Sequence, residues 1–167
     1  MKKEIKRNLV NILIVDDLKD NLMALEGLLR RNDIEIFKAG SATEALEFMI
    51  DYEFALALID VQMPVMNGFE LAELMRGLKK TKNIPIIFVT ATAKNQNLSF
   101  KGYDLGAVDF LPKPLDTFAV KSKVNIFIEI YQQKKEQEEL LKKLKNNWNY
   151  QTMKPNEPKK RQNELMN

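Results

Sequence analysis

Short apolar runs alternate along this chain with segments in which apolar residues recur every three or four positions. The run from Phe54 to Ile59 contains no polar residue, which is typical of a strand buried on both faces in the middle of a parallel sheet. Asp60 follows directly and is therefore predicted to lie at the carboxyl end of that strand. Ligands bind at this edge of open α/β sheets, although Asp is also a common turn residue.

The remaining elements follow from the same pattern. Four further apolar runs are predicted as strands, over residues 11–15, 34–38, 84–90 and 107–111. Helical spacing predicts helices over residues 19–31, 41–49, 67–78 and 94–105, with a long final helix from about residue 115. Ser41 and Glu44 match a capping box, Asn67 is a good N-cap, and Gly106 suits a helix C-terminus. Strand and helix alternate five times, so we predict an α/β fold with a doubly wound five-stranded parallel sheet.

Polar residues gather where four of these strands end. The strand ends are followed by Asp16-Asp17, Asp60, Thr90 and Lys113. Three carboxylates at one edge repel one another unless a cation lies among them, and oxygen ligands suit Mg²⁺. A nearby ammonium and hydroxyl would help to neutralise a phosphoryl group, and a carboxylate can itself be the nucleophile.

Composition narrows the chemistry further. The chain has 167 residues, 45% of them hydrophobic, with no histidine and no cysteine. Histidine general bases, serine–histidine triads, thiolate nucleophiles and zinc sites built on these residues are therefore excluded. Catalysis would depend on carboxylates, lysine, hydroxyls and a hard cation.

Charge and hydropathy bear on partners and location. The net charge is +3, and nine basic and five acidic residues lie from Gln132 onward, so the body before it is slightly acidic. This distribution argues against direct nucleic-acid binding by the fold. No apolar run approaches the roughly 20 residues that span a bilayer, and the N-terminus does not resemble a signal peptide. We therefore expect a cytoplasmic chain with no membrane partner.

Over residues 11 to 121 the sequence resembles the receiver domain of response regulators in bacterial two-component systems. The resemblance rests on four motifs that occur in order at the predicted strand ends: Ile14 to Asp17, Ile59 to Gly68, Val89 to Ala91, and Phe110 to Pro114. It implies a flavodoxin-like sheet of the receiver type. It also implies a phosphorylation switch that acts as an enzyme only in its own phosphotransfer and autodephosphorylation.

The resemblance assigns the acidic residues. Asp60 would be the phosphoacceptor, accepting a phosphoryl group from a histidine kinase or a histidine phosphotransfer protein. Mg²⁺, or Mn²⁺, would be bound by Asp17 and Asp60, oriented by Asp16 through water, and ligated by the backbone carbonyl of Gln62.

The resemblance also assigns the residues around the phosphoryl group. Lys113, the Thr90 hydroxyl and the backbone N–H of Ala91 would bind phosphoryl oxygens. Phe110 occupies the switch position and would turn inward as Thr90 moves, which would change the signalling face. The peptide bond between Lys113 and Pro114 would be cis, as X-Pro bonds can be.

The final helix is longer than a receiver needs. We expect a basic N-terminal segment at 1–8, a receiver domain at 9–130, a helical extension at 131–150 and a disordered basic tail at 151–167. Apolar residues at heptad-like spacing make the extension a candidate coiled coil and homodimer seam. The candidate seam residues are Phe127, Ile130, Leu141, Leu144 and Trp148. A solvated helix with (i, i+4) ion pairs is the alternative.

Three other functions are alternatives for a chain of this kind. The first is an aspartate-nucleophile phosphatase. Such enzymes resemble one another in carrying a second Asp two residues after the nucleophile, and Gln62 at that position in this chain argues against this function. A flavin-binding protein of this topology would need a polar, glycine-rich loop where this chain has Asp16 and Asp17. A receiver that is never phosphorylated and serves as a dimerisation module remains open, although the intact acidic pocket disfavours it.

Overall fold

The computed structural model of the chain describes residues 9–91, 101–107 and 109–153. Five strands are assigned: β1 (Val10–Val15), β2 (Ile34–Ala39), β3 (Leu56–Asp60), β4 (Ile86–Thr90) and β5 (Asp109–Pro112). The helices are α1 (Lys19–Leu29), α2 (Ala42–Asp51), α3 (Gly68–Gly77) and α5 (Thr117–Met153). The predicted basic segment at 1–8 lies outside the described residues, as do residues 154–167 of the predicted tail.

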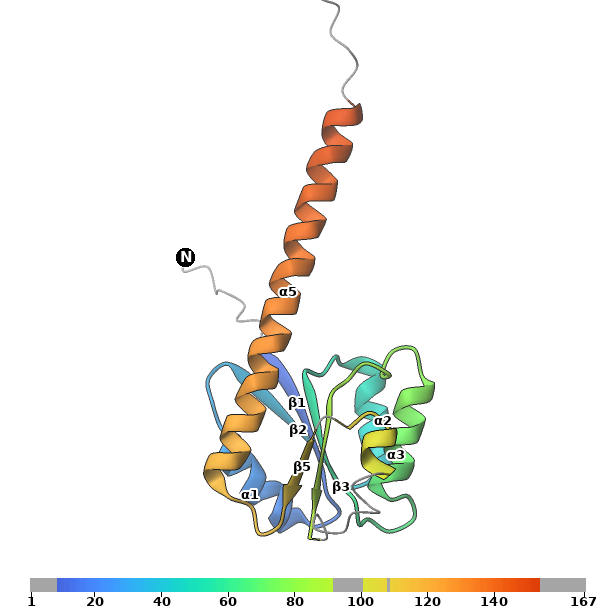
Figure 1. Cartoon of the computed structure of the whole chain (residues 1–167), viewed down its shortest axis with the longest axis vertical. Coiled ribbons are helices and arrows are strands. Elements are labelled where there is room, and N and C mark those ends of the chain that lie inside the picture. Colours follow the sequence, from blue (N-terminus) through green and yellow to red (C-terminus); the bar gives the residue numbers. More distant parts are fainter. Residues whose placement is uncertain (1–8, 92–100, 108, 154–167) are drawn as a thin grey trace, which may run out of the picture. The chain divides into compact units, whose positions relative to one another are not determined.

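The strands form one parallel sheet in the order β2-β1-β3-β4-β5 (Figure 1). The predicted α/β class, with its doubly wound five-stranded sheet and long final helix, is confirmed. β3 is the middle strand and all five of its residues are buried, as its uninterrupted apolar sequence predicted. β2 and β5 are the two edge strands of the sheet.

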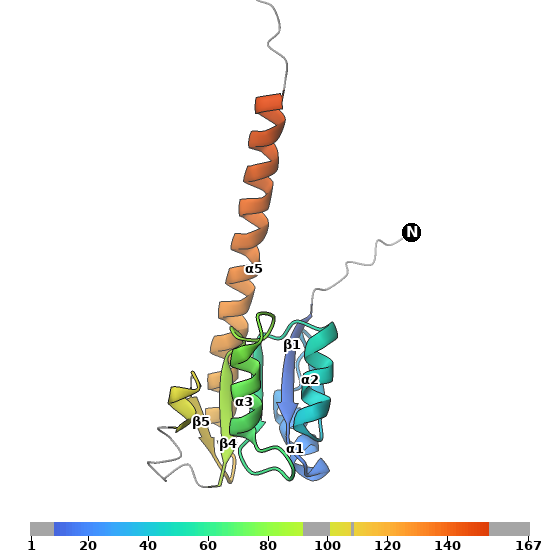
Figure 2. The same cartoon turned by 90° about the vertical axis from the view of Figure 1, so that its right-hand side faces the viewer.

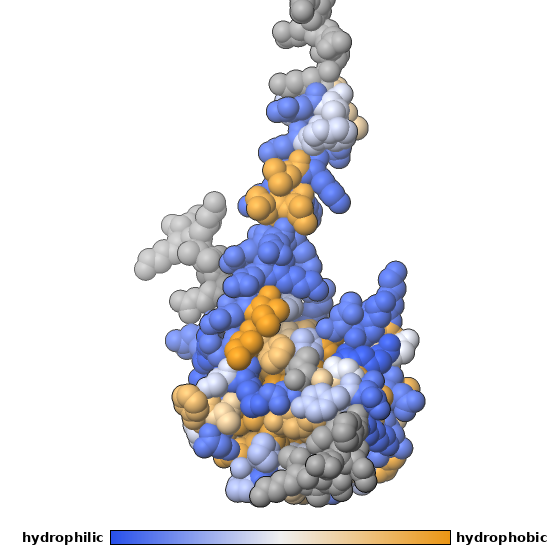
Figure 3. Space-filling view, in the orientation of Figure 1, coloured by the Kyte–Doolittle hydropathy of each residue, from blue (hydrophilic) through white to orange (hydrophobic). Residues whose placement is uncertain are grey.

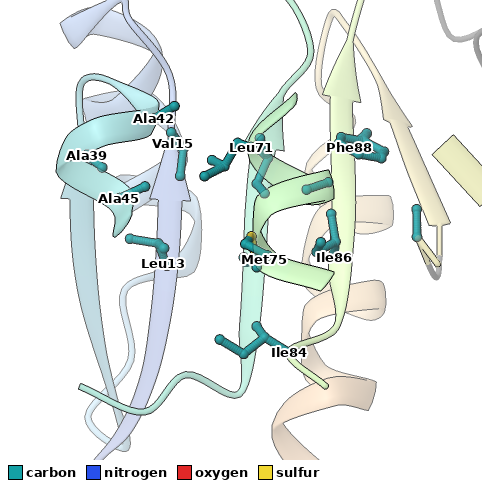
Figure 4. Close-up of a cluster of buried hydrophobic side chains, with 14 of the residues drawn as sticks. Leu13, Val15, Ala39, Ala42, Ala45, Leu71, Met75, Ile84, Ile86 and Phe88 are labelled. Atoms are coloured by element: carbon teal, nitrogen blue, oxygen red, sulfur yellow. The ribbon is translucent and has the colours of Figure 1, made fainter. Parts of the chain in front are cut away.

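Helices cover both faces of the sheet (Figures 1 and 2). α2 and α3 pack on one face, where side chains such as Leu71, Met75 and Phe88 form one buried cluster (Figure 4). α1 and the first turns of α5 pack on the other face, where Leu25, Val120 and other apolar side chains form a second cluster. Both faces of the central strands are therefore removed from water, which explains their continuous apolar sequence.

Two helix starts show how local sequence fixes the elements. The Ser41 hydroxyl accepts the Glu44 backbone N–H at 3.1 Å, but the Glu44 carboxylate accepts the N–H of Gly40 instead of returning to Ser41. The capping box predicted there is therefore only half formed. At α3 the box is complete, because Asn67 and Glu70 each accept the other's backbone N–H, at 2.9 and 2.8 Å.

The helix predicted over residues 94–105 falls largely outside the described residues. Residues 101–104 are helical, and Gly106 after them has a φ of +75°, a left-handed conformation typical of helix C-termini. The Arg76 guanidinium links this turn to the body of the fold. It donates to the carbonyls of Leu105 and Gly106 at 2.8 and 3.0 Å, and to those of Lys82 and Ile84 at 2.8 and 2.9 Å.

The chain divides into two units, Met1–Gln132 and Gln133–Asn167. In the second unit the described residues are helical up to Met153, three residues beyond the predicted end of the extension. Within the described residues, no helix combines the length and the apolar character that a bilayer crossing requires.

Candidate functional site

The sheet brings two of the predicted acidic residues together. β1 and β3 are neighbours, with Val15 paired to Ile59, so the residues that follow them, Asp16 and Asp60, lie side by side. Their exposed fractions are only 7% and 6%. Asp17 contributes a third carboxylate, and one oxygen from each of the three lies within 4.8 Å of the others. Oxygen atoms gathered in this way fit a hard divalent cation such as Mg²⁺.

Each buried carboxylate is held by backbone and side-chain donors. Asp16 Oδ1 accepts the N–H of Leu18 at 2.9 Å, which places a carboxylate at the start of α1, where Leu18 itself provides no side-chain cap. Asp16 Oδ2 accepts Asn21 Nδ2 at 3.0 Å. Asp60 Oδ1 accepts the backbone N–H of Gln62 at 3.2 Å.

Lys113 joins the two buried acids. Its Nζ lies 3.2 Å from Asp16 Oδ2 and 3.3 Å from Asp60 Oδ2. The backbone N–H of Lys113 donates to the carbonyl of Thr90 at 3.0 Å, which fixes the start of this loop beside β4. The Lys113–Pro114 peptide bond is cis.

The pKa values of Asp60 and Lys113 are both raised, but for different reasons. Burial raises the pKa of Asp60, and the neighbouring Asp16 carboxylate raises it further, while Lys113 and the Gln62 N–H oppose the rise. Burial by itself lowers the pKa of Lys113, but its hydrogen bonds and charge interactions with Asp16 and Asp60 outweigh this and raise it. Lys113 therefore stays cationic beside a carboxyl group that is harder to ionise than usual.

The remaining predicted phosphoryl ligands lie on the adjacent strand. β4 pairs with β3, with Asp60 opposite Val89, so Thr90 and Ala91 come just after the level of Asp60 at the same edge of the sheet. Thr90 is 1% exposed, whereas Ala91 is exposed. Gln62, whose carbonyl was predicted as a metal ligand, is the second residue of the loop after Asp60.

Phe110, predicted as the switch aromatic, is 9% exposed. Its ring lies 5.6 Å from that of Phe88 and 5.3 Å from that of Tyr103. The ring also occupies the space that a Cβ at position 102 would need, so Gly102 makes the close approach possible. In this structure Phe110 therefore lies inward, against β4 and the helical turn at residues 101–104.

Two features of the loop after Asp60 were not foreseen. A Cβ at Gly68 would overlap the carbonyl oxygen of Asp60, so the start of α3 packs directly on the backbone of the predicted phosphoacceptor. Val65 has a φ of 67° and is fully exposed, although β-branched residues rarely adopt this conformation. The glycine at position 68 is a signal in the sequence for a close backbone approach, but no feature of the sequence predicts a left-handed conformation at Val65.

The candidate seam residues are not equivalent. Phe127 is only partly exposed because it packs against the cluster on the α1 side of the sheet. It therefore packs, at least in part, on its own domain, and its place in a dimer seam stays a prediction. Ile130, Leu141, Leu144 and Trp148 are 51–69% exposed, and Leu140 joins them at 58%. Figure 3 shows an apolar group on the otherwise hydrophilic helix.

Comparison with known proteins agrees with this fold. The family model of the response regulator receiver domain matches residues 12–125. The chain therefore belongs to the response regulator receiver domains of two-component signalling, as its motifs predicted. Among solved structures, chemotaxis protein CheY4 of Vibrio cholerae has a TM-score of 0.67 at 26% identity, covering 71% of this chain and 98% of CheY4. A CheY-like receiver domain protein from Methanospirillum hungatei has a TM-score of 0.66 at 30% identity, covering 77% and 98%.

Sequence relatives are longer than this chain. A Vibrio cholerae protein named as a probable cyclic di-GMP phosphodiesterase is 34% identical over 119 residues, which cover 71% of this chain and 26% of that protein. Transcriptional regulatory protein SrrA of Staphylococcus aureus is 33% identical over 117 residues, covering 70% of this chain and 47% of SrrA. The chain thus spans between a quarter and a half of the length of these relatives.

Proposed function

We propose that this chain is a phosphorylation switch whose phosphoacceptor is Asp60. The observation that carries the proposal is the placement of a buried carboxylate between an ammonium and two further acids at the binding edge of the sheet. The donor would be the phosphohistidine of a histidine kinase or a phosphotransfer protein. Family membership supports this donor class, and the absence of histidine from this chain means that the donor must be another molecule or another part of a longer protein.

In the proposed transfer, an oxygen of Asp60 attacks the phosphorus atom while the bond from phosphorus to the imidazole nitrogen breaks. The imidazole keeps that bonding pair, and the phosphoryl group becomes an acyl phosphate on Asp60. Lys113 Nζ, 3.3 Å from Asp60 Oδ2, is placed to follow the new negative charge onto a phosphoryl oxygen. The Thr90 hydroxyl and the Ala91 N–H, at the end of the neighbouring strand, would supply two more donors.

The residues present fit a divalent cation. Asp17, Asp60 and the carbonyl of Gln62 would hold Mg²⁺ or Mn²⁺, with Asp16 orienting it, because all offer oxygen and the three carboxylates already lie together. The bound ion would neutralise charge on the phosphoryl oxygens. Asp17 is the better direct ligand, since both oxygens of Asp16 already accept hydrogen bonds.

We further propose that Thr90 and Phe110 convert the phosphoryl group into a change of the surface around β5. Phe110 and Thr90 lie on adjacent paired strands, and the Phe110 ring packs on Tyr103, which is 52% exposed. A shift of Thr90 toward the phosphoryl group would thus reach a surface side chain through one buried ring.

The test uses beryllofluoride, a stable mimic of a phosphoryl group, and the small donor acetyl phosphate. In Mg²⁺, the parent chain should bind the first and be phosphorylated by the second, with one added phosphoryl group visible by mass spectrometry. Asp60→Asn should do neither. Asp51→Asn, which changes an exposed acid at the end of α2, is the matched control and should behave as the parent does. Equal binding by Asp60→Asn would exclude Asp60 as the phosphoacceptor.

A homodimer through the second unit is proposed in addition. Leu140, Leu141, Leu144 and Trp148 expose more than half of their surface on one helix, and a second copy would cover them. Leu144→Glu should weaken self-association in sedimentation experiments, while the exposed Lys142→Glu should have little effect. Unchanged sedimentation of Leu144→Glu would rule out this seam. A dimer that forms but takes up no phosphoryl group would instead favour a pure dimerisation module.

A further inference from the structure

Asp16 Oδ2 is shared by two donors of different kinds. Asn21 Nδ2 donates to it at 3.0 Å and Lys113 Nζ donates to it at 3.2 Å. Because Asp16 is 7% exposed, water competes little for this oxygen. The strength with which Asp16 attracts Lys113 therefore depends on whether the Asn21 amide donates to the same oxygen.

Lys113 is balanced between two carboxylates. Its distances to Asp16 Oδ2 and Asp60 Oδ2 differ by only 0.1 Å, at 3.2 and 3.3 Å. A neutral amide at Asp16 Oδ2 satisfies part of that oxygen's hydrogen-bonding capacity without adding charge. Removing the amide would leave Asp16 freer to draw the ammonium away from Asp60.

Asn21 is also held in the right place for this role. It lies in the first turn of α1, and its backbone N–H donates to the carbonyl of Leu18 at 3.1 Å. The N–H of Leu18 in turn donates to Asp16 Oδ1, so Asp16 and Asn21 are fixed to the same turn. Asn residues near helix starts usually serve as caps, but here Leu18 is the N-cap and the Asn21 amide donates to Asp16.

We propose that Asn21 is a positioning residue that acts through Asp16 to keep Lys113 on Asp60. This inference rests on the proposed phosphorylation of Asp60. It assigns to Asn21 no contact with the phosphoryl group. Its effect should appear in how tightly the site holds a phosphoryl group, and only when Asp16 is present.

The experiment is a double-mutant cycle with Asn21→Ala and Asp16→Asn, read out by beryllofluoride affinity at saturating Mg²⁺. Asn21→Ala should weaken binding about tenfold in the parent, the scale of one charge-assisted hydrogen bond, and by less than about twofold in the Asp16→Asn background. Asn21→Asp, which keeps the shape but adds a carboxylate that attracts Lys113, should also weaken binding. If the alanine variant folds poorly, the beryllofluoride affinity of Asn21→Asp is measured in its place.

The matched control is Asn11→Ala. Asn11 Nδ2 makes a hydrogen bond of the same length, 3.0 Å, to the carbonyl of Glu53, away from the acidic cluster. This variant should lose a similar amount of thermal stability and keep its beryllofluoride affinity. Equal losses from Asn21→Ala in both backgrounds, or no loss in the parent, would overturn the inference while leaving the proposed function intact. A parent chain that binds no beryllofluoride would refute the proposed function, and the role of Asn21 would be rejected with it.

Discussion

Replacing Asp60 by Asn should stabilise the folded chain in the absence of divalent cations. The substitution keeps the size of the side chain and the acceptor for the Gln62 N–H, but it removes one of three clustered negative charges. It also removes the charge that attracts Lys113. The sign of the change in stability depends on which of these effects is larger.

The distances allow a first estimate. Two like charges 4.8 Å apart, the largest separation in the cluster, repel by about 3.5 kcal/mol at an effective dielectric constant of about 20. Asp16 is such a neighbour, and burial of the Asp60 carboxylate disfavours its charged form further. Its attraction to Lys113 at 3.3 Å is about 5 kcal/mol on the same scale. Burial and the repulsion from Asp16 together outweigh this attraction, because the pKa of Asp60 is raised. Asp60→Asn should therefore stabilise the folded chain by on the order of 1 kcal/mol and raise the Tm by about 3 °C.

The gain should depend on pH in a defined direction. Burial, and then Asp16, raise the pKa of Asp60, so folding favours the protonated acid. In the parent, the stabilising contribution of protonated Asp60 is complete at pH values below about 4, the pKa of this group in the unfolded chain. The contribution is lost as the pH rises through the higher pKa of Asp60 in the folded chain. Asp60→Asn should therefore match the parent at acid pH and exceed it at neutral pH.

Thermal unfolding followed by circular dichroism, between pH 4 and 8 in chelator, measures this difference. Mg²⁺ should reverse it, because a cation that binds the folded parent more tightly than the variant stabilises the parent by mass action. Asp51→Asn should show neither the gain nor the reversal. An Asp60→Asn variant no more stable than the parent at pH 7 in chelator would refute the reasoning that burial and like-charge repulsion outweigh the attraction to Lys113.

Three further substitutions test other features of the fold. Val65→Gly should stabilise the chain by about 1 kcal/mol in urea unfolding, because it removes the left-handed strain of an exposed β-branched residue; a loss of stability would contradict this. Gly68→Ala should lower the free energy of unfolding by about 2 kcal/mol and weaken beryllofluoride binding, because the added methyl group would displace the Asp60 backbone. Unchanged binding would show that the loop adapts. Arg76→Lys should cost about 2–3 kcal/mol in urea unfolding, because an ammonium cannot reproduce four guanidinium bonds to carbonyls; a loss below about 0.5 kcal/mol would mean that water replaces them.

The features readable from the sequence were those set by periodicity. The apolar run ending at Asp60 identified the middle strand because burial on both faces leaves no polar position. Once strands and helices alternate, a parallel sheet brings the ends of β1, β3 and β4 to one edge, so the sequence alone groups Asp16, Asp60 and Thr90.

Features that depend on tertiary contacts were not readable. The bond from Asn21 to Asp16 links two residues whose separation in sequence carries no signal, because Asn near a helix start is ordinary. Phe127 fitted a heptad seam, but the sequence could not show that α5 turns this ring toward its own domain. The four carbonyls bound by Arg76 are backbone groups, and they leave no trace in residue identity.

The two edge strands have a consequence for behaviour at high concentration. β2 carries the exposed charged residues Glu35 and Lys38, and β5 has four residues and ends at Pro112, which has no N–H to offer a further strand. Charge, shortness and proline all hinder the addition of a strand from another molecule. Fibril-like stacking through the sheet is therefore disfavoured even when the chain is crowded.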